Sequence, residues 1–127
     1  MEHPTVSAET EAAIAEAIRL VDEAENISVL TGAGISTDSG IPDFRGPQGL
    51  WTKDPAAEKA SNIQHYVVDP DVRKVNWERR AAGELWADVE ANDGHRALVQ
   101  LEHREKLNTL ITQNVDGLHQ RAGSSPE

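Results

Sequence analysis

The feature that most constrains the fold is a short apolar run that leads directly into a glycine-rich segment. Residues 26–31, "NISVLT", are apolar and β-branched, and residues 32–51, "GAGISTDSGIPDFRGPQGLW", contain five glycines and two prolines. This pattern is typical of a strand that ends in a tight turn. At the carboxyl end of a parallel strand, such a turn presents backbone N–H groups with no side chain in the way, so a diphosphate can bind there. Residues 32–51 are therefore a candidate cofactor-binding loop.

Regular elements are expected on both sides of this loop. Apolar side chains recur at three- and four-residue steps through residues 12–24, which predicts an amphipathic helix. Ser7 or Thr10 could cap this helix, and Asn26 could end it. A second β-type run, "KLNTLIT", occupies residues 106–112. The two runs predict two strands of one sheet.

The segment between the two runs is predicted to be mostly helical. Residues 52–72 are polar without a clear period and predict loop and short helical turns. Residues 73–90 predict a helix, and residues 94–105 predict another that Asp93 could cap. The tryptophans of the first of these helices are expected to be packing anchors: Trp77 and Trp86. The order of elements predicts an α/β fold, a Rossmann-like parallel sheet with flanking helices.

Composition fits a single globular domain over residues 1–127, because 38% of the residues are hydrophobic, enough to bury a core. The net charge of -10 repels nucleic acid and anionic lipid, so we expect neither as a partner. The absence of cysteine excludes disulfides, a thiolate nucleophile and a cysteine-ligated metal site in these residues. The sequence has no basic leader and no apolar run of about 20 residues, which predicts a cytoplasmic location.

Within the loop, Gly32 and Gly34 are the candidates for contact with phosphates, and the hydroxyl of Ser36 can donate a hydrogen bond to them. The common dinucleotide fingerprint has a third glycine where Thr37 stands, which disfavours a nicotinamide-dependent dehydrogenase. "GAG" alone also fits a tight strand-to-helix turn without any ligand.

Two further groups of polar residues favour a ligand site. Asp43, Phe44 and Arg45 place a carboxylate, an aromatic ring and a guanidinium at consecutive positions. The turn "TQNVDG" follows the second predicted strand, and adjacent strand ends of an open α/β sheet form one crevice, so Asn114 and Asp116 should face the loop. An amide beside a carboxylate suits recognition of a carboxamide, although an Asx turn that caps the next helix would explain either residue alone.

Together, "GAGISTDSGIPDFRG", "GLW" and "TQNVDGLHQRAG" resemble the sirtuins, the NAD-dependent protein deacylases, and the resemblance covers residues 26–123. It implies that NAD is consumed as a co-substrate. An acyl-lysine carbonyl oxygen attacks the ribose carbon that carries nicotinamide, and the acyl group passes to ADP-ribose. The partner is then an acyl-lysine protein or peptide.

The resemblance also implies roles for individual residues. Asn114 and Asp116 are the expected catalytic positions, which orient nicotinamide and ribose. The expected cofactor-binding residues are Gly32, Ala33, Gly34, Ser36, Ile41, Asp43, Phe44, Arg45, Trp51, Gln113, Asn114, Val115 and Asp116. No metal ligand is expected among these 127 residues.

The sequence departs from the sirtuin pattern in one respect. The general-base histidine of the family follows the "QRAG" segment within an "HG" pair, and the four-cysteine zinc module comes later still. Neither is present up to Glu127. We therefore expect a truncated, N-terminal part of a sirtuin that is inactive alone, with zinc only in a full-length version. His119 matches a non-catalytic position of the motif and is expected to pack in a helix.

Two expectations follow from this departure. A part of a sirtuin should leave strand edges and apolar helix faces uncovered. The alternative to an enzyme is a binding module that holds NAD or ADP-ribose without turnover.

Overall fold

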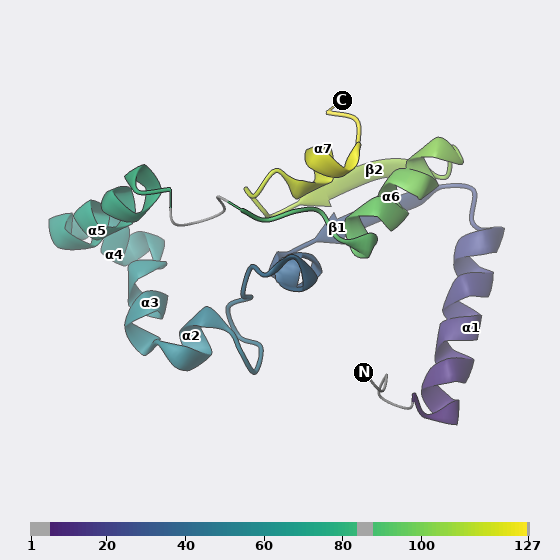
Figure 1. Cartoon of the computed structure of the whole chain (residues 1–127), viewed down its shortest axis with the longest axis horizontal. Helices are drawn as coiled ribbons and strands as arrows, with labels where there is room; N and C mark the ends of the chain where they lie inside the picture. Colours follow the sequence, from purple (N-terminus) through teal and green to yellow (C-terminus); the bar gives the residue numbers. More distant parts are fainter. Residues whose placement is uncertain (1–5, 84–87, 127) are drawn as a thin grey trace.

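The computed structural model describes residues 6–83 and 88–126. These residues form a small parallel sheet with helices beside it and a group of helices that extends away from it (Figure 1). In chain order the elements are α1 (Ala8–Glu23), β1 (Ile27–Thr31), the 3-10 helix η1 (Ala33–Ser39), α2 (Leu50–Lys53), α3 (Pro55–Ala60), α4 (Ile63–Val68), α5 (Pro70–Ala81), α6 (Asp93–His103), β2 (Leu107–Thr112) and α7 (Leu118–Ala122).

The sheet consists of β1 and β2, which run parallel and pair Val29 with Leu110 and Thr31 with Thr112. Both strands lie within one residue of the predicted runs, because β-branched stretches bounded by polar residues and glycine favour strands. Helix α6 packs on β2 and on α7, whereas α2 to α5 extend away from the sheet (Figure 1). The α/β prediction, with a parallel sheet and flanking helices, is confirmed for the described residues.

Helix α1 begins as predicted, since the Ser7 side chain accepts a hydrogen bond from the backbone of Thr10. It ends at Glu23, before Asn26, so the predicted end was wrong by a few residues. The Lys106 ammonium lies at this end of the helix and donates to the carbonyl oxygens of Asp22 and Ala24, at 2.6 and 2.8 Å. A cation is favourable there because the last carbonyl groups of a helix lack intrahelical donors.

The middle of the chain differs from the prediction. Residues 52–72 form short helices rather than mostly loop, and α5 begins at Pro70 because the Asp69 carboxylate caps its first turn. The helix expected over residues 73–90 ends at Ala81, and Gly83 then takes a positive φ of 69°. Trp77 is 62% exposed, so it is not a packing anchor; Trp86 lies outside the described residues.

The buried apolar core of the described residues is small. It consists of Ala57 in α3, Val99 in α6 and Leu118 in α7, and several polar side chains are buried near the sheet. Ile18 and Leu30 stay 63% and 67% exposed. Composition predicts enough apolar residues to bury a core, and the core of the described residues is small. The expectation that strand edges and apolar helix faces stay uncovered is confirmed for these residues, because the sheet has two strands and Ile18 in α1 is exposed.

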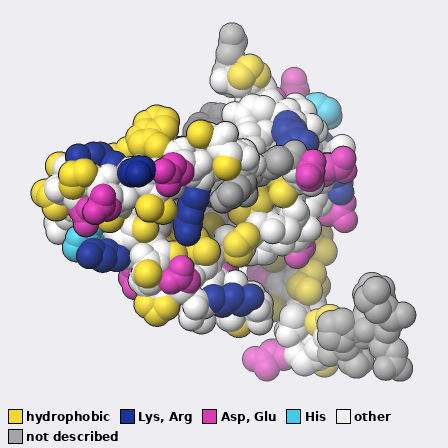
Figure 2. Space-filling model, turned by 60° about the vertical axis from the view of Figure 1, so that its left-hand side comes forward, with side chains coloured by type: hydrophobic (Ala, Val, Ile, Leu, Met, Phe, Trp, Pro, Cys, Tyr) yellow, Lys and Arg dark blue, Asp and Glu magenta, His cyan; other side chains and the backbone are white. Residues whose placement is uncertain are grey.

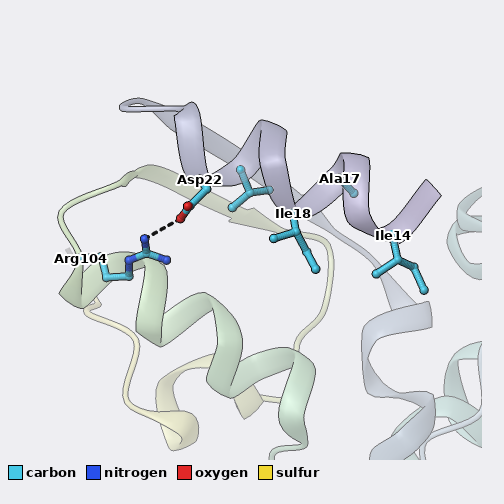
Figure 3. A pocket seen from close by; sticks show the side chains of 6 residues that line it. Ile14, Ala17, Ile18, Asp22 and Arg104 are labelled. Atoms are coloured by element: carbon cyan, nitrogen blue, oxygen red, sulfur yellow. Dashed lines mark hydrogen bonds and ion pairs between the residues drawn. The ribbon is translucent and has the colours of Figure 1, made fainter. Parts of the chain in front are cut away.

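Hydrophobic side chains are exposed on the surface of the molecule. Figure 2 shows them among charged groups of both signs. A shallow apolar hollow lies along α1, lined by Ile14, Ala17, Ile18 and Val21, and the 2.9 Å ion pair between Asp22 and Arg104 stands at its end (Figure 3). No helix within residues 6–83 or 88–126 is long and apolar enough to cross a membrane.

Candidate functional site

The candidate site lies where the carboxyl ends of β1 and β2 meet. Thr31 and Thr112 are paired as the last residues of their strands, and the backbone N–H of Gln113 donates to the Thr31 carbonyl at 3.0 Å. The glycine loop therefore starts beside the "QNVDG" turn. The predicted convergence of the two turns is confirmed.

The polar side chains of the second turn contact the glycine loop directly. The Asn114 amide donates to the carbonyl oxygen of Gly32 at 2.8 Å. The Ser36 hydroxyl donates to Asp116 Oδ2 at 2.7 Å, and Ser36 is only 1% exposed. A hydroxyl that donates to a carboxylate makes a strong, charge-assisted hydrogen bond. These bonds fix the amide and the carboxylate next to each other and beside the loop.

Asp116 has a second contact. Its Oδ1 atom accepts from the backbone N–H of Leu118 at 3.0 Å, so the residue also forms the helix-capping Asx turn that was the alternative interpretation. The Asx turn is therefore confirmed for Asp116, and its other carboxylate oxygen accepts from Ser36 in the glycine loop. The half-buried carboxylate is thus held rigidly from two sides.

The glycine segment is more regular than a simple turn, because residues Ala33–Ser39 form the 3-10 helix η1. A Cβ atom added at Gly34 would meet nothing within 4 Å. The packing of the described residues therefore does not require glycine at this position, whereas a ligand that approaches the backbone would. Gly40, which ends η1 with a φ of 93°, is required by its own backbone conformation.

The second predicted group, in residues 43–51, forms a cluster of its own. Asp43 accepts from the backbone N–H of Gly46 at 2.9 Å. The rings of Phe44 and Trp51 lie 4.8 Å apart between centroids, and the Arg45 guanidinium lies 4.4 Å from the Trp51 ring centroid. Within residues 6–83 and 88–126, no hydrogen bond or ring contact joins this cluster to Asn114 or Asp116. The structure thus assembles the two groups separately.

The remaining predicted residues lie along these same segments. Ile41 is half-buried, and its backbone N–H donates to the Ser36 carbonyl at 3.3 Å. Ala33 is half-buried at the start of η1. Gln113 is exposed, and Val115 is 73% exposed.

Two residues behind the site were missed by sequence reasoning. Asn92, rather than Asp93, is the N-cap of α6, and its amide donates to the carbonyl of Ile35 and the hydroxyl of Ser39 in η1, at 2.8 and 2.9 Å. His95, three positions later, completes the capping box. An Asn followed by a polar residue at the third helical position is a helix-start signal that could have indicated this cap.

His119 is buried, as predicted, at 3% exposure, and contacts the Thr31 hydroxyl at 2.8 Å through Nε2. His95 is fully buried beside it, with the ring centroids 5.0 Å apart. Burial lowers the pKa of both histidines below the ordinary value, although the Asp116 carboxylate acts in the opposite direction. No cluster of metal-ligating side chains occurs in the part of the chain that the structure describes.

Comparison with known proteins gives a consistent result. The family model of the Sir2 family matches residues 32–126. NAD-dependent protein deacetylase 2 of Streptomyces coelicolor is 52% identical over 100 residues, which cover 78% of this chain and 41% of that protein. The NAD-dependent protein deacetylase of Chromobacterium violaceum is 47% identical over 106 residues, which cover 84% and 43%.

Solved structures of Sir2 proteins also resemble this chain. One described as "Structural Basis for the Mechanism and Regulation of Sir2 Enzymes" aligns with a TM-score of 0.74 at 40% identity over 91% of this chain and 44% of that chain. A Sir2 homologue in complex with ADP-ribose aligns with a TM-score of 0.69 at 39% identity, covering 87% and 43%. The chain thus spans less than half the length of the relatives that it matches.

Proposed function

Because this chain belongs to the Sir2 family, we propose that it is the NAD-binding part of an NAD-dependent protein deacetylase. The observation that carries the proposal is the hydrogen-bonded cluster of Ser36, Asn114 and Asp116 at adjacent strand ends. Relatives named NAD-dependent protein deacetylase, and Sir2 structures that contain ADP-ribose or an acetylated peptide, support the choice of substrates.

In the proposed function NAD is a substrate, and its phosphates lie against the glycine loop. Gly32, Ala33, Gly34 and Ser36 would contact the diphosphate and the neighbouring ribose. The open space beside Gly34 fits this role, since a side chain there would stand between the backbone and the ligand. Ile41, Asp43, Phe44, Arg45 and Trp51 would surround the nicotinamide side, and Gln113 and Val115 would flank the polar turn.

Asn114 and Asp116 would orient the nicotinamide carboxamide. The Asn114 amide nitrogen is already engaged by Gly32, which directs its Oδ1 atom as the acceptor for a carboxamide N–H. The Asp116 carboxylate is fixed by Ser36 and the Leu118 backbone and can accept a second carboxamide N–H. Groups held rigidly before the ligand arrives cost little to organise, which favours both binding and cleavage of the nicotinamide bond.

We propose that the acyl-lysine of a protein supplies the attacking carbonyl oxygen, and that the protein acts in the cytoplasm. A histidine base and a zinc module would belong to the longer protein. The 127 residues alone should bind NAD without turnover, because they contain no residue that matches the family's base. Nicotinamide release by the purified 127-residue chain with NAD and an acetylated peptide would contradict this.

The binding proposal is tested with Asn114→Asp, which keeps the size of the side chain but removes its amide donor and adds a negative charge next to Asp116. Calorimetry should show NAD binding weakened at least tenfold, about 1.4 kcal/mol, with ADP-ribose binding changed much less. Asn108→Asp, at an exposed position of β2, adds the same charge away from the strand ends and is the matched control. Equal loss for NAD and ADP-ribose would contradict a carboxamide role.

A further inference from the structure

Two buried histidines stand behind the candidate site and are not used by the proposed reaction. His95 in α6 is 0% exposed and His119 in α7 is 3% exposed. Their rings meet edge to face at an interplanar angle of 68°. Fully buried imidazoles are uncommon unless their nitrogen atoms have specific partners.

The contacts of His119 define a directed hydrogen-bond chain. The Thr31 hydroxyl donates to Thr112 Oγ1 at 2.9 Å, so Thr31 must accept from His119, whose proton is therefore on Nε2. Thr112 Oγ1 in turn accepts from the backbone N–H of Asn114 at 3.0 Å. The chain of bonds runs from the buried imidazole through both strand ends to the residue that would hold the carboxamide.

The contacts of His95 reach the other half of the site. Its Nδ1 atom accepts from the backbone N–H of Asn92 at 3.2 Å, so its proton is also on Nε2. This bond fixes the Asn92 cap, whose side chain donates to Ile35 and Ser39 of η1. His95 is thereby connected to the glycine loop, as His119 is connected to Asn114.

We propose that His95 and His119 in their neutral Nε2–H forms are positioning residues that hold η1 and Asn114 in the geometry required for NAD. The identity of the ligand, NAD, rests on the proposed function. The positioning role itself rests on the hydrogen bonds that connect the two histidines to η1 and to Asn114. His95 Nε2 and His119 Nδ1 have no hydrogen-bond partner among the described residues. In these tautomers the first atom is a donor and the second an acceptor, and the two rings meet edge to face.

Protonation of either ring would break this arrangement. A second proton on His119 would place a charged donor on Nδ1, and one on His95 Nδ1 would compete with the Asn92 N–H. The groups that act electrostatically on the pair are Asp116, which favours protonation of both, and Arg96, which opposes that of His95. Burial lowers the pKa of both, so the neutral pair persists at neutral pH and is lost as the pH falls.

The protonation state can be read directly. Long-range ¹H–¹⁵N correlation spectra of the 127-residue chain at pH 7.5 should show the Nε2–H tautomer for both His95 and His119. The Nδ1–H tautomer at His119 would reverse the bond chain and overturn the proposal. As the pH is lowered, the protection factor of the Asn114 backbone amide, corrected for the intrinsic exchange rate at each pH, should fall together with titration of His119. This readout needs no nucleotide, so it separates the positioning role from the proposed function.

Variants test the effect on binding. His119→Leu removes the donor and should weaken NAD binding at least tenfold, whereas His119→Gln, whose amide can replace Nε2–H, should restore it to within about threefold of the parent. His103→Leu, at an exposed position of α6, is the control and should leave binding unchanged.

If His119→Leu fails to fold, the double variant H95N/H119Q tests whether protonation of the two histidines weakens NAD binding. It keeps an acceptor near His95 Nδ1 and a donor near His119 Nε2 but cannot be protonated in this range. The parent should lose NAD affinity as the pH falls through the lowered pKa values of the two histidines, and the double variant should not. The same loss in both would overturn the proposal. If the parent binds no NAD, the proposed function fails, and the tautomer and exchange measurements still decide the positioning role.

Discussion

At the residue scale, Ser36 shows how one hydroxyl joins the two halves of the site. Its side chain is 1% exposed and donates to Asp116 at 2.7 Å. Ser36→Ala leaves the carboxylate without this donor, and hydrogen bonds to charged groups contribute about 1.5–3 kcal/mol. We expect the free energy of unfolding in urea to fall by about 2 kcal/mol. Ser28→Ala, at an exposed strand position, should change it by under about 0.5 kcal/mol; similar values for the two variants would contradict the role of Ser36.

Gly34 in η1 and Gly40, the residue that caps the end of η1, distinguish a glycine required by ligand binding from one required by its own backbone conformation. Gly40 has a φ of 93°, so Gly40→Ala should cost about 1 kcal/mol of stability through backbone strain. Gly34 has no positive φ and open space around it, so Gly34→Ala should leave the stability within about 0.5 kcal/mol of the parent. Calorimetry should nevertheless show weaker NAD binding for Gly34→Ala. Unchanged NAD affinity in this folded variant would remove Gly34 from the proposed phosphate site.

At the element scale, α6 and η1 are coupled through the side chain of Asn92. Asn92→Asp keeps the capping oxygen that accepts from Gly94 at 2.8 Å, but it loses the amide donors to Ile35 and Ser39. Hydrogen exchange should therefore accelerate in η1 while the first turn of α6 stays protected. Asn62→Asp is the matched control, because Asn62 caps α4 in the same way. Unchanged exchange in η1 would mean that Asn92 acts only as a cap.

The elements that sequence predicted well are those fixed by local chemistry. The strands follow from β-branched runs, and α1 from its apolar period and the Ser7 cap. The early end of α5 and the 3-10 form of η1 depend on backbone conformations that periodicity does not reveal. The convergence of Asn114 and Asp116 on the loop was predictable from parallel strand ends. The link from His95 through Asn92 to η1 was not, because no rule like that for parallel strand ends relates the start of α6 to η1.

At the scale of the whole molecule, the buried histidines make stability depend on pH. Their pKa values are lowered in the folded state, so the unfolded chain binds more protons once the pH falls below the ordinary histidine value of about 6.5. Stability is therefore fully present above that pH and declines below it, until the lowered folded pKa values are passed. Urea unfolding between pH 8 and 5 should show this decline, and H95N/H119Q should reduce it. An equal decline in the double variant would assign the effect to other groups.

The parallel pairing of β1 with β2 also has a kinetic consequence. The strands are joined by a connection of about 75 residues, and closing a loop of that length costs on the order of 4 kcal/mol of chain entropy. The bonds from Ser36 to Asp116, from Asn114 to Gly32 and from His119 to Thr31 all span this closure. The site therefore forms only when the two distant strands pair, and we expect this pairing to follow formation of the local helices. A nucleotide that binds at both strand ends would hold β1 and β2 together. Tighter binding should therefore give slower separation of the two strands and slower unfolding.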